Sequence, residues 1–216
     1  MLTIKKFIFN AFQLNAYVVY DENGDCLLFD PAVSNHAEMQ QLETFISENN
    51  LTPILLVNTH SHIDHIIGNR KVAERYQVKL AAHPGGQGFI DRAEDSSARF
   101  GLPFDGVKKI DIPLDEGDTL TLGKHVLKVF YTPGHADGSL CFYAEPEGFV
   151  ITGDVLFNQS IGRTDLPTGD YDLLQKSIWE KLFTLPDETV VYPGHGPDTS
   201  IGVEKKTNPF VAIGME

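Results

Sequence analysis

The stretch ILLVNTHSHIDH, residues 54–65, decides the fold of this 216-residue chain. Its apolar start predicts a strand covered on both faces, and a helical pattern begins near Asp64. In extended chain, residues two apart point to the same side, so His60 and His62 face one way. Asp64 and His65 follow at the turn into the helix. The stretch therefore predicts that four side chains able to bind a metal converge at the end of one strand.

The same arrangement recurs at three other places, where a strand pattern meets a Gly or Pro turn and then His or Asp. These are His135 after residues 126–131, Asp154 after residues 149–152, and His195 after residues 190–192. Loops at one edge of a rigid sheet are where sites are usually assembled. Five histidines and two aspartates at four strand ends match two divalent ions held by nitrogen and oxygen. Three histidines stand outside this pattern and are predicted to be ordinary polar residues: His36, His83 and His125.

Strand and helix patterns alternate twice along the chain. Helices are predicted over residues 36–49, 64–76 and 170–183, with Asp170 as the N-cap of the last. Two sheets packed face to face with helices outside account for this order. The predicted fold class is α/β (α+β), a four-layer αβ/βα sandwich of two mixed sheets, and residues 1–216 are predicted to be a single domain. Residues 84–104 are predicted to be either a lid or a surface helix.

Composition excludes several classes of function. Lys and Arg number 17 against 30 Asp and Glu, a net charge of −13. Binding to nucleic acid or to an anionic membrane needs basic surface, so neither is expected. No apolar run approaches the roughly 18 residues that a membrane span needs, and the N-terminus does not fit a signal peptide. Two cysteines without CxxC spacing predict free thiols and a cytoplasmic location.

The motifs HSHIDH, TPGH, TGD and YPGH resemble those of the metallo-beta-lactamase superfamily, and the resemblance covers nearly the whole chain. It implies an αβ/βα sandwich with a metal site at the sheet edges. It also implies two divalent ions; zinc is the first choice, and iron or manganese also suit His and Asp. The implied ligands are His60, His62 and His135 for the first ion, Asp64, His65 and His195 for the second, and Asp154 for both.

Three further segments resemble the glyoxalase II branch, the hydroxyacylglutathione hydrolases: DEGDTLTLG, SIGRTDLPTGDYDLL and GVEKKTNPF. Longer members of that branch carry a C-terminal helical region whose basic residues hold glutathione. Here only residues 196–216 follow His195, with Lys205 and Lys206 as their only cations. The chain therefore resembles the short single-domain subgroup. The resemblance implies an enzyme that hydrolyses a small acyl-thioester such as S-lactoylglutathione.

The expected chemistry uses a hydroxide that bridges the metals. Two divalent ions lower the pKa of bound water toward about 7, and the hydroxide would attack the thioester carbonyl. A thiolate leaves without a strong acid because a thiol pKa is only about 8.5. Asp64, besides being a ligand, is the candidate to orient the water or accept its proton. Arg163 either holds a substrate carboxylate or pairs with Asp165 or Asp170.

An iron-dependent persulfide (sulfur) dioxygenase is the alternative function. Such enzymes share this fold and a GRTD-type segment, and they hold one iron with two His and one Asp. His60, His135 and Asp154 supply that triad here. A periplasmic beta-lactamase is disfavoured by the lack of an export signal, and an RNA-processing enzyme by the negative charge. A scaffold without catalysis is disfavoured because buried His and Asp side chains that bind no metal would cost folding free energy. The sequence does not indicate the oligomeric state.

Overall fold

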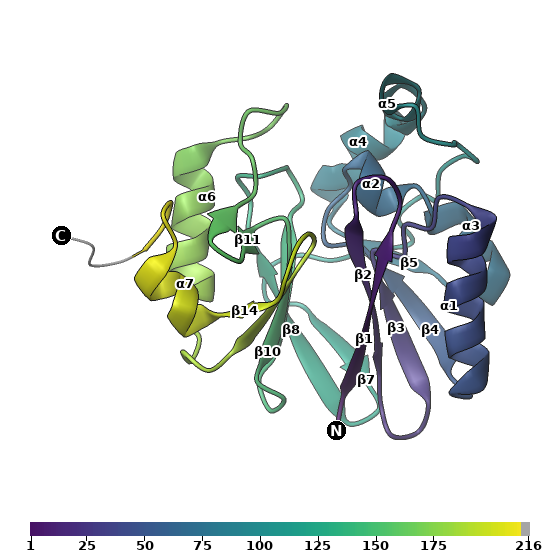
Figure 1. Cartoon of the computed structure of the whole chain (residues 1–216), viewed down its shortest axis with the longest axis horizontal. Coiled ribbons are helices and arrows are strands. Elements are labelled where there is room, and N and C mark those ends of the chain that lie inside the picture. Colours follow the sequence, from purple (N-terminus) through teal and green to yellow (C-terminus); the bar gives the residue numbers. More distant parts are fainter. Residues whose placement is uncertain (213–216) are drawn as a thin grey trace.

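Two six-stranded sheets lie face to face in the computed structural model, which describes residues 1–212 (Figure 1). The first sheet has the order β1-β2-β3-β4-β5-β6, and the second has the order β14-β13-β10-β9-β8-β7. Each sheet contains parallel and antiparallel pairs; β3 and β4 are parallel in the first, and β10 and β13 are parallel in the second. The predicted sandwich of two mixed sheets is therefore confirmed.

The strands of the first sheet are β1 (Thr3–Phe9), β2 (Leu14–Tyr20), β3 (Asp25–Phe29), β4 (Thr52–Val57), β5 (Leu80–Ala82) and β6 (Ile112–Pro113). The strands of the second sheet are β7 (Thr119–Leu122), β8 (His125–Tyr131), β9 (Leu140–Ala144), β10 (Phe149–Gly153), β13 (Val190–Pro193) and β14 (Thr199–Ser200). A small separate hairpin pairs β11 (Leu156–Phe157) with β12 (Ser160–Ile161).

Three apolar layers hold the sandwich together. Between the sheets, Phe29 packs edge-on against Phe142, with ring centroids 5.1 Å apart. Helices α1 (His36–Glu48) and α3 (Asn69–Tyr76) cover the outer face of the first sheet, and α6 (Tyr171–Ser177) and α7 (Ile201–Thr207) cover that of the second (Figure 1). Each fully buried side chain of this size contributes about 1.5–3 kcal/mol. This packing thus determines at which edge of the sandwich the polar residues that follow the strands lie.

The helix predicted over residues 64–76 is broken in the structure. It forms α2 (Ile63–Ile66) and α3, which begins after Gly68. A Cβ at Gly68 would lie 2.3 Å from the carbonyl oxygen of Pro31, so the backbone can approach that loop only without a side chain. A tertiary contact therefore requires a glycine at the break between the two helices.

The helix predicted over residues 170–183 begins as expected. The side chain of Asp170 accepts a hydrogen bond from the amide of Leu173, and α6 then continues into a π-helical turn, η2 (Ile178–Leu182). Residues 84–104 form a short 3₁₀ turn, η1 (Pro84–Gly86), followed by α4 (Gln87–Asp91) and α5 (Ala93–Phe100). Within the part of the chain that the structure describes, no helix is long and apolar enough to cross a membrane.

Candidate metal centre

The predicted ligands meet at one edge of the sandwich. His60 follows β4, His135 follows β8, Asp154 follows β10 and His195 follows β13. All seven predicted residues fall into three groups whose ligand atoms lie within 4.8 Å of one another. The groups are His60, His62 and His135; His60, His65 and Asp154; and Asp64, His65 and His195. Residues from four distant segments thus form one cluster.

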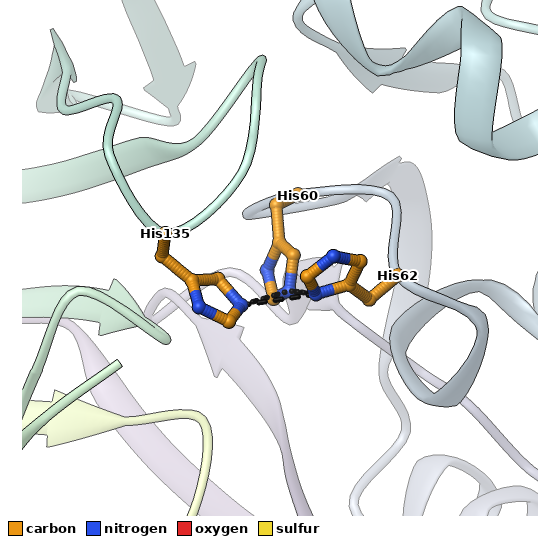
Figure 2. A group of neighbouring side chains, drawn as sticks. All are labelled: His60, His62 and His135. Atoms are coloured by element: carbon orange, nitrogen blue, oxygen red, sulfur yellow. Dashed lines mark hydrogen bonds between the residues drawn. The ribbon is translucent and has the colours of Figure 1, made fainter. Parts of the chain in front are cut away.

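Three ring nitrogens form a nearly equilateral triangle (Figure 2). His62 Nδ1 lies 3.1 Å from His60 Nε2 and 3.0 Å from His135 Nε2, and the two Nε2 atoms are 3.3 Å apart. Metal–nitrogen bonds of about 2.05 Å at tetrahedral angles place nitrogens about 3.3 Å apart. The triangle therefore has the size that a tetrahedral divalent ion requires.

Hydrogen bonds on the far side of the rings orient two of these nitrogens. His135 Nδ1 donates to the carbonyl of Arg163 at 2.8 Å. His60 Nδ1 lies 3.2 Å from Thr59 Oγ1, which itself donates to Asp30 and so accepts from His60. A neutral imidazole carries one N–H, so both Nε2 atoms present lone pairs toward each other. Lone pairs at this distance repel unless a cation lies between them.

The histidines of a second group are oriented in the same way, with Nδ1 donating a hydrogen bond and Nε2 facing the cluster. His65 Nδ1 donates to Asp30 at 2.9 Å, and His195 Nδ1 donates at 3.1 Å to a backbone carbonyl of the β1–β2 turn. Their Nε2 atoms face carboxylates: His195 lies 3.2 Å from Asp64 Oδ2, and His65 lies 3.4 Å from Asp154 Oδ1. Both His65 Nε2 and Asp154 Oδ1 are buried without a hydrogen-bond partner. An unpaired buried polar group costs about 1–3 kcal/mol, and a cation between them would satisfy both. The residues present fit a pair of divalent ions.

Protonation in the cluster follows from burial and charge. Burial lowers the pKa of His60 well below its usual value, and the neighbouring His65 and His62 lower it further. Burial alone would also lower the pKa of His65, but Asp154, Asp30 and Asp64 raise it well above its usual value. Burial alone would raise the pKa of Asp154, but His65 brings it below the usual range. The carboxylates are therefore ionised at neutral pH and attract positive charge to the centre.

The sequence model of the metallo-beta-lactamase superfamily matches residues 10–195. The chain belongs to this superfamily. Its fold binds divalent metal ions, and the His and Asp cluster occupies the corresponding edge of the sandwich.

Two relatives from this superfamily align with nearly the whole chain. The probable metallo-hydrolase YqgX of Bacillus subtilis is 37% identical over 203 residues, 92% of this chain and 92% of its own. Hydroxyacylglutathione hydrolase GloC of Haemophilus influenzae is 34% identical over 208 residues, 93% of this chain and 94% of its own.

Three solved members of the superfamily share the fold. The B3 metallo-beta-lactamase BLEG-1 is 38% identical with a TM-score of 0.88, covering 97% of this chain and 99% of its own. TTHA1623, solved in a di-iron-bound form, is 33% identical with a TM-score of 0.84, covering 95% and 99%. ETHE1 from Myxococcus xanthus is 30% identical with a TM-score of 0.80, covering 97% and 84%.

A cavity of about 670 Å³ opens above the His and Asp cluster. Five of the predicted ligands line it: His62, Asp64, His135, Asp154 and His195. Its walls carry four phenylalanines and three arginines: Phe12, Phe89, Phe100, Phe157, Arg92, Arg99 and Arg163. The cavity combines apolar and aromatic side chains with polar and charged ones that converge on it, as sites for small molecules do.

Both interpretations of Arg163 find support in its surroundings. Arg163 is one of the residues that line the cavity, and its guanidinium makes two hydrogen bonds of 2.7 Å to the carboxylate of Asp165. Asp170, the other predicted partner, caps α6 instead.

The three histidines outside the pattern lie outside the cluster. His83 stacks on Tyr131, and none of His36, His83 and His125 belongs to a group that could hold a metal among residues 1–212.

Asp30 is a residue of the site that the sequence reasoning missed. It is 2% exposed and accepts hydrogen bonds from the amide and hydroxyl of Thr59, from Asn58 and from His65. It therefore orients His65 directly and His60 through Thr59, as partners of metal-bound histidines commonly do. The signal was present, because Asp30 follows the strand β3 just as Asp154 follows β10.

The glycine before His195 has a role that turn formation does not explain. A Cβ at Gly194 would lie 2.2 Å from Asp154 Oδ1 and 3.0 Å from His65 Cε1. Gly194 thus leaves room for the carboxylate at the centre of the cluster.

Proposed function

We propose that this protein is a metal-dependent thioester hydrolase of the glyoxalase II type, acting on S-lactoylglutathione or a related acyl-thiol. The observation that carries the proposal is the cluster of seven His and Asp side chains at the floor of a cavity of about 670 Å³. The 34% identity to a hydroxyacylglutathione hydrolase over 93% of this chain supports the choice of substrate.

The proposed ligands follow the geometry of the cluster. His60, His62 and His135 would hold one ion, Asp64, His65 and His195 would hold the second, and Asp154 would serve both. Asp154 suits this role because Oδ1 lies 3.4 Å from His65 Nε2 and Oδ2 lies 3.6 Å from His135 Nε2. Zinc is the proposed metal, and iron or manganese also suit these ligands.

When bound, the ions supply Lewis acidity, which lowers the pKa of water toward neutrality and polarises a carbonyl. Side chains of the protein take the remaining roles. Burial alone would raise the pKa of Asp64, but His65 and His195 lower it, so its carboxylate is ionised and able to orient water or take its proton. Phe89 and Phe157 line the cavity and exclude bulk water. No strong acid is required, because a thiolate with a pKa of about 8.5 is the leaving group.

Arg163 is the proposed contact for a substrate carboxylate. Its ion pair with Asp165 is exposed, with side-chain exposures of 60% and 67%. Exposed pairs contribute only about 0–1 kcal/mol, so a substrate carboxylate can compete with Asp165 for the guanidinium.

The proposed location is the cytoplasm, and the free thiols of Cys26 and Cys141 support it.

A persulfide dioxygenase is the second candidate. Two histidines and one carboxylate suit non-haem iron, and His60, His135 and Asp154 form such a triad. In it, His135 Nε2 lies 3.3 Å from His60 Nε2 and 3.6 Å from Asp154 Oδ2. The likeness to TTHA1623, which was solved with two irons, supports iron as a metal for this fold.

The test uses protein loaded separately with zinc and with iron. Hydrolysis of S-lactoylglutathione is followed by the loss of thioester absorbance, and oxygen consumption is measured with glutathione persulfide. We expect turnover of the thioester that disappears in His62→Ala. Absence of hydrolysis with either metal, together with oxygen uptake that survives His62→Ala, would replace the hydrolase with the dioxygenase, because His62 lies outside that triad.

A further inference from the structure

The cavity wall holds the chain's unpaired arginines. Of the five arginines, Arg70 pairs with Glu74 within α3, Arg75 pairs with Glu43 of α1, and Arg163 pairs with Asp165. Arg92 and Arg99 make no ion pair within residues 1–212, and both line the cavity above the metal centre. In a chain with 30 acidic residues and a net charge of −13, one cavity is thus lined by two arginines without an ion pair, and such side chains are able to bind an anionic group.

Contacts connect Arg92 to the centre. Its guanidinium carbon lies 5.8 Å from the centroid of the Phe89 ring. That ring meets the His62 ring edge-on, with centroids 4.9 Å apart. Arg92 is therefore separated from a proposed ligand by a single aromatic ring.

Arg99 stands further along the same wall. It lies seven residues after Arg92, which is two helical turns or about 10 Å along the axis of α5. The next residue, Phe100, packs edge-on against Phe12 of the β1–β2 turn, with centroids 5.6 Å apart. In Figure 1, α4 and α5 stand beside α2 at the edge of the sandwich that carries the centre. One acidic residue, Asp95, also lines this wall.

The two lysines near the C-terminus are engaged elsewhere. Lys205 and Lys206 both pair with Asp187, and neither lines the cavity. They are therefore not available to hold a substrate that lies over the centre.

We propose that Arg92 and Arg99 bind the anionic carrier end of the substrate, an inference that rests on the proposed thioester hydrolysis. With the acyl group at the centre, the thiol carrier extends along Phe89 toward Phe100. The ligand chemistry is an oxyanion, taken up by a planar guanidinium through paired hydrogen bonds. It comes either from carboxylates, as in a glutathione-like peptide, or from phosphates, as in a coenzyme A thioester. Arg92 and Arg99, at the start and in the last turn of α5, thus supply the positive charge for the carrier.

Binding of thioether analogues to the zinc-loaded protein tests this without hydrolysis. The probes are S-methylglutathione and S-methyl coenzyme A, titrated by calorimetry. The variants are Arg92→Gln, Arg99→Gln and their combination. Arg75→Gln is the matched control, because it removes an exposed guanidinium from α3, outside the cavity.

We expect at least one analogue to bind, with its Kd raised about tenfold in each single variant and more in the double variant, and unchanged in Arg75→Gln. The analogue that responds identifies carboxylate or phosphate as the anion. Equal Kd values for the wild type and the double variant, or no binding of either analogue at millimolar concentration, overturns the proposal. Arginine-dependent binding without hydrolysis of either thioester leaves the anion site in place and rejects the proposed function.

Discussion

The substitution Asp30→Asn tests whether hydrogen bonds to Asp30 orient the histidines of the cluster for metal binding. Asp30 Oδ1 accepts from the amide of Thr59 at 2.9 Å and from Asn58 at 3.1 Å. Its Oδ2 accepts from the hydroxyl of Thr59 at 2.6 Å and from His65 Nδ1 at 2.9 Å. An asparagine keeps the shape of the side chain, but it replaces one carboxylate oxygen with an NH₂ group. That group is a donor, and it would face groups that now donate to Asp30.

The smallest adjustment puts the NH₂ group at the Oδ2 position, facing His65. His65 Nδ1 must then accept, so the proton moves to Nε2, the atom that faces Asp154 at 3.4 Å. A protonated Nε2 cannot bind a metal. Loss of such a supporting carboxylate typically weakens metal binding about 10–100-fold, or about 1.4–2.7 kcal/mol. We expect the ion next to His65 to be affected first.

The assay is competition for zinc with a chromophoric chelator, which reports affinity and stoichiometry together. Asp21→Asn is the matched control, because Asp21 is also buried (5% exposed) and accepts from backbone amides of Asn23 and Asp25, away from the centre. Zinc affinity in Asp30→Asn within twofold of the wild type, or an equal loss in both variants, would refute this account of the histidine orientation.

Three further outcomes are expected. Gly194→Ala should lose metal while keeping its circular dichroism spectrum, because its Cβ would lie 2.2 Å from Asp154 Oδ1; full metal content would contradict this. Arg163→Ala should raise the KM for S-lactoylglutathione with little change in kcat, and an unchanged KM would remove its binding role. Burial raises the thiol pKa to about 12 in both Cys26 and Cys141, so below that pH they stay protonated. At about pH 8 the native protein should label with a disulfide reagent roughly a thousandfold more slowly than the unfolded chain; fast labelling of the native protein would show that the thiols are accessible.

Local sequence was sufficient for the longer strands and for the residues of the cluster, but not for the two-residue strands β11, β12 and β14. An apolar run that ends in His-Ser-His can be recognised because strand side chains alternate, and that periodicity does not depend on the rest of the fold. The same rule, applied at the ends of β8, β10 and β13, found the three residues of the cluster that lie outside the HSHIDH segment. It would also have found Asp30 had it been applied to β3.

Contacts between distant segments could not be inferred in this way. The requirement for glycine at position 68 depends on the carbonyl of Pro31, and that at position 194 depends on Asp154; neither neighbour is adjacent in sequence. The partner of Arg163 was open between two aspartates, and only the turn geometry selected Asp165.

By itself the sequence determined the mixed sandwich, the strand ends and the types of donor atom, because each depends on short-range periodicity and turn chemistry. Only the tertiary structure decided which nitrogen of each histidine faces the centre, since that depends on hydrogen bonds from Asp30, Arg163 and the β1–β2 turn. It also decided that Arg92 and Arg99 stand over the same cavity. The physical reason is that hydrogen bonds and charge act across space, between residues that the packing of two sheets brings together.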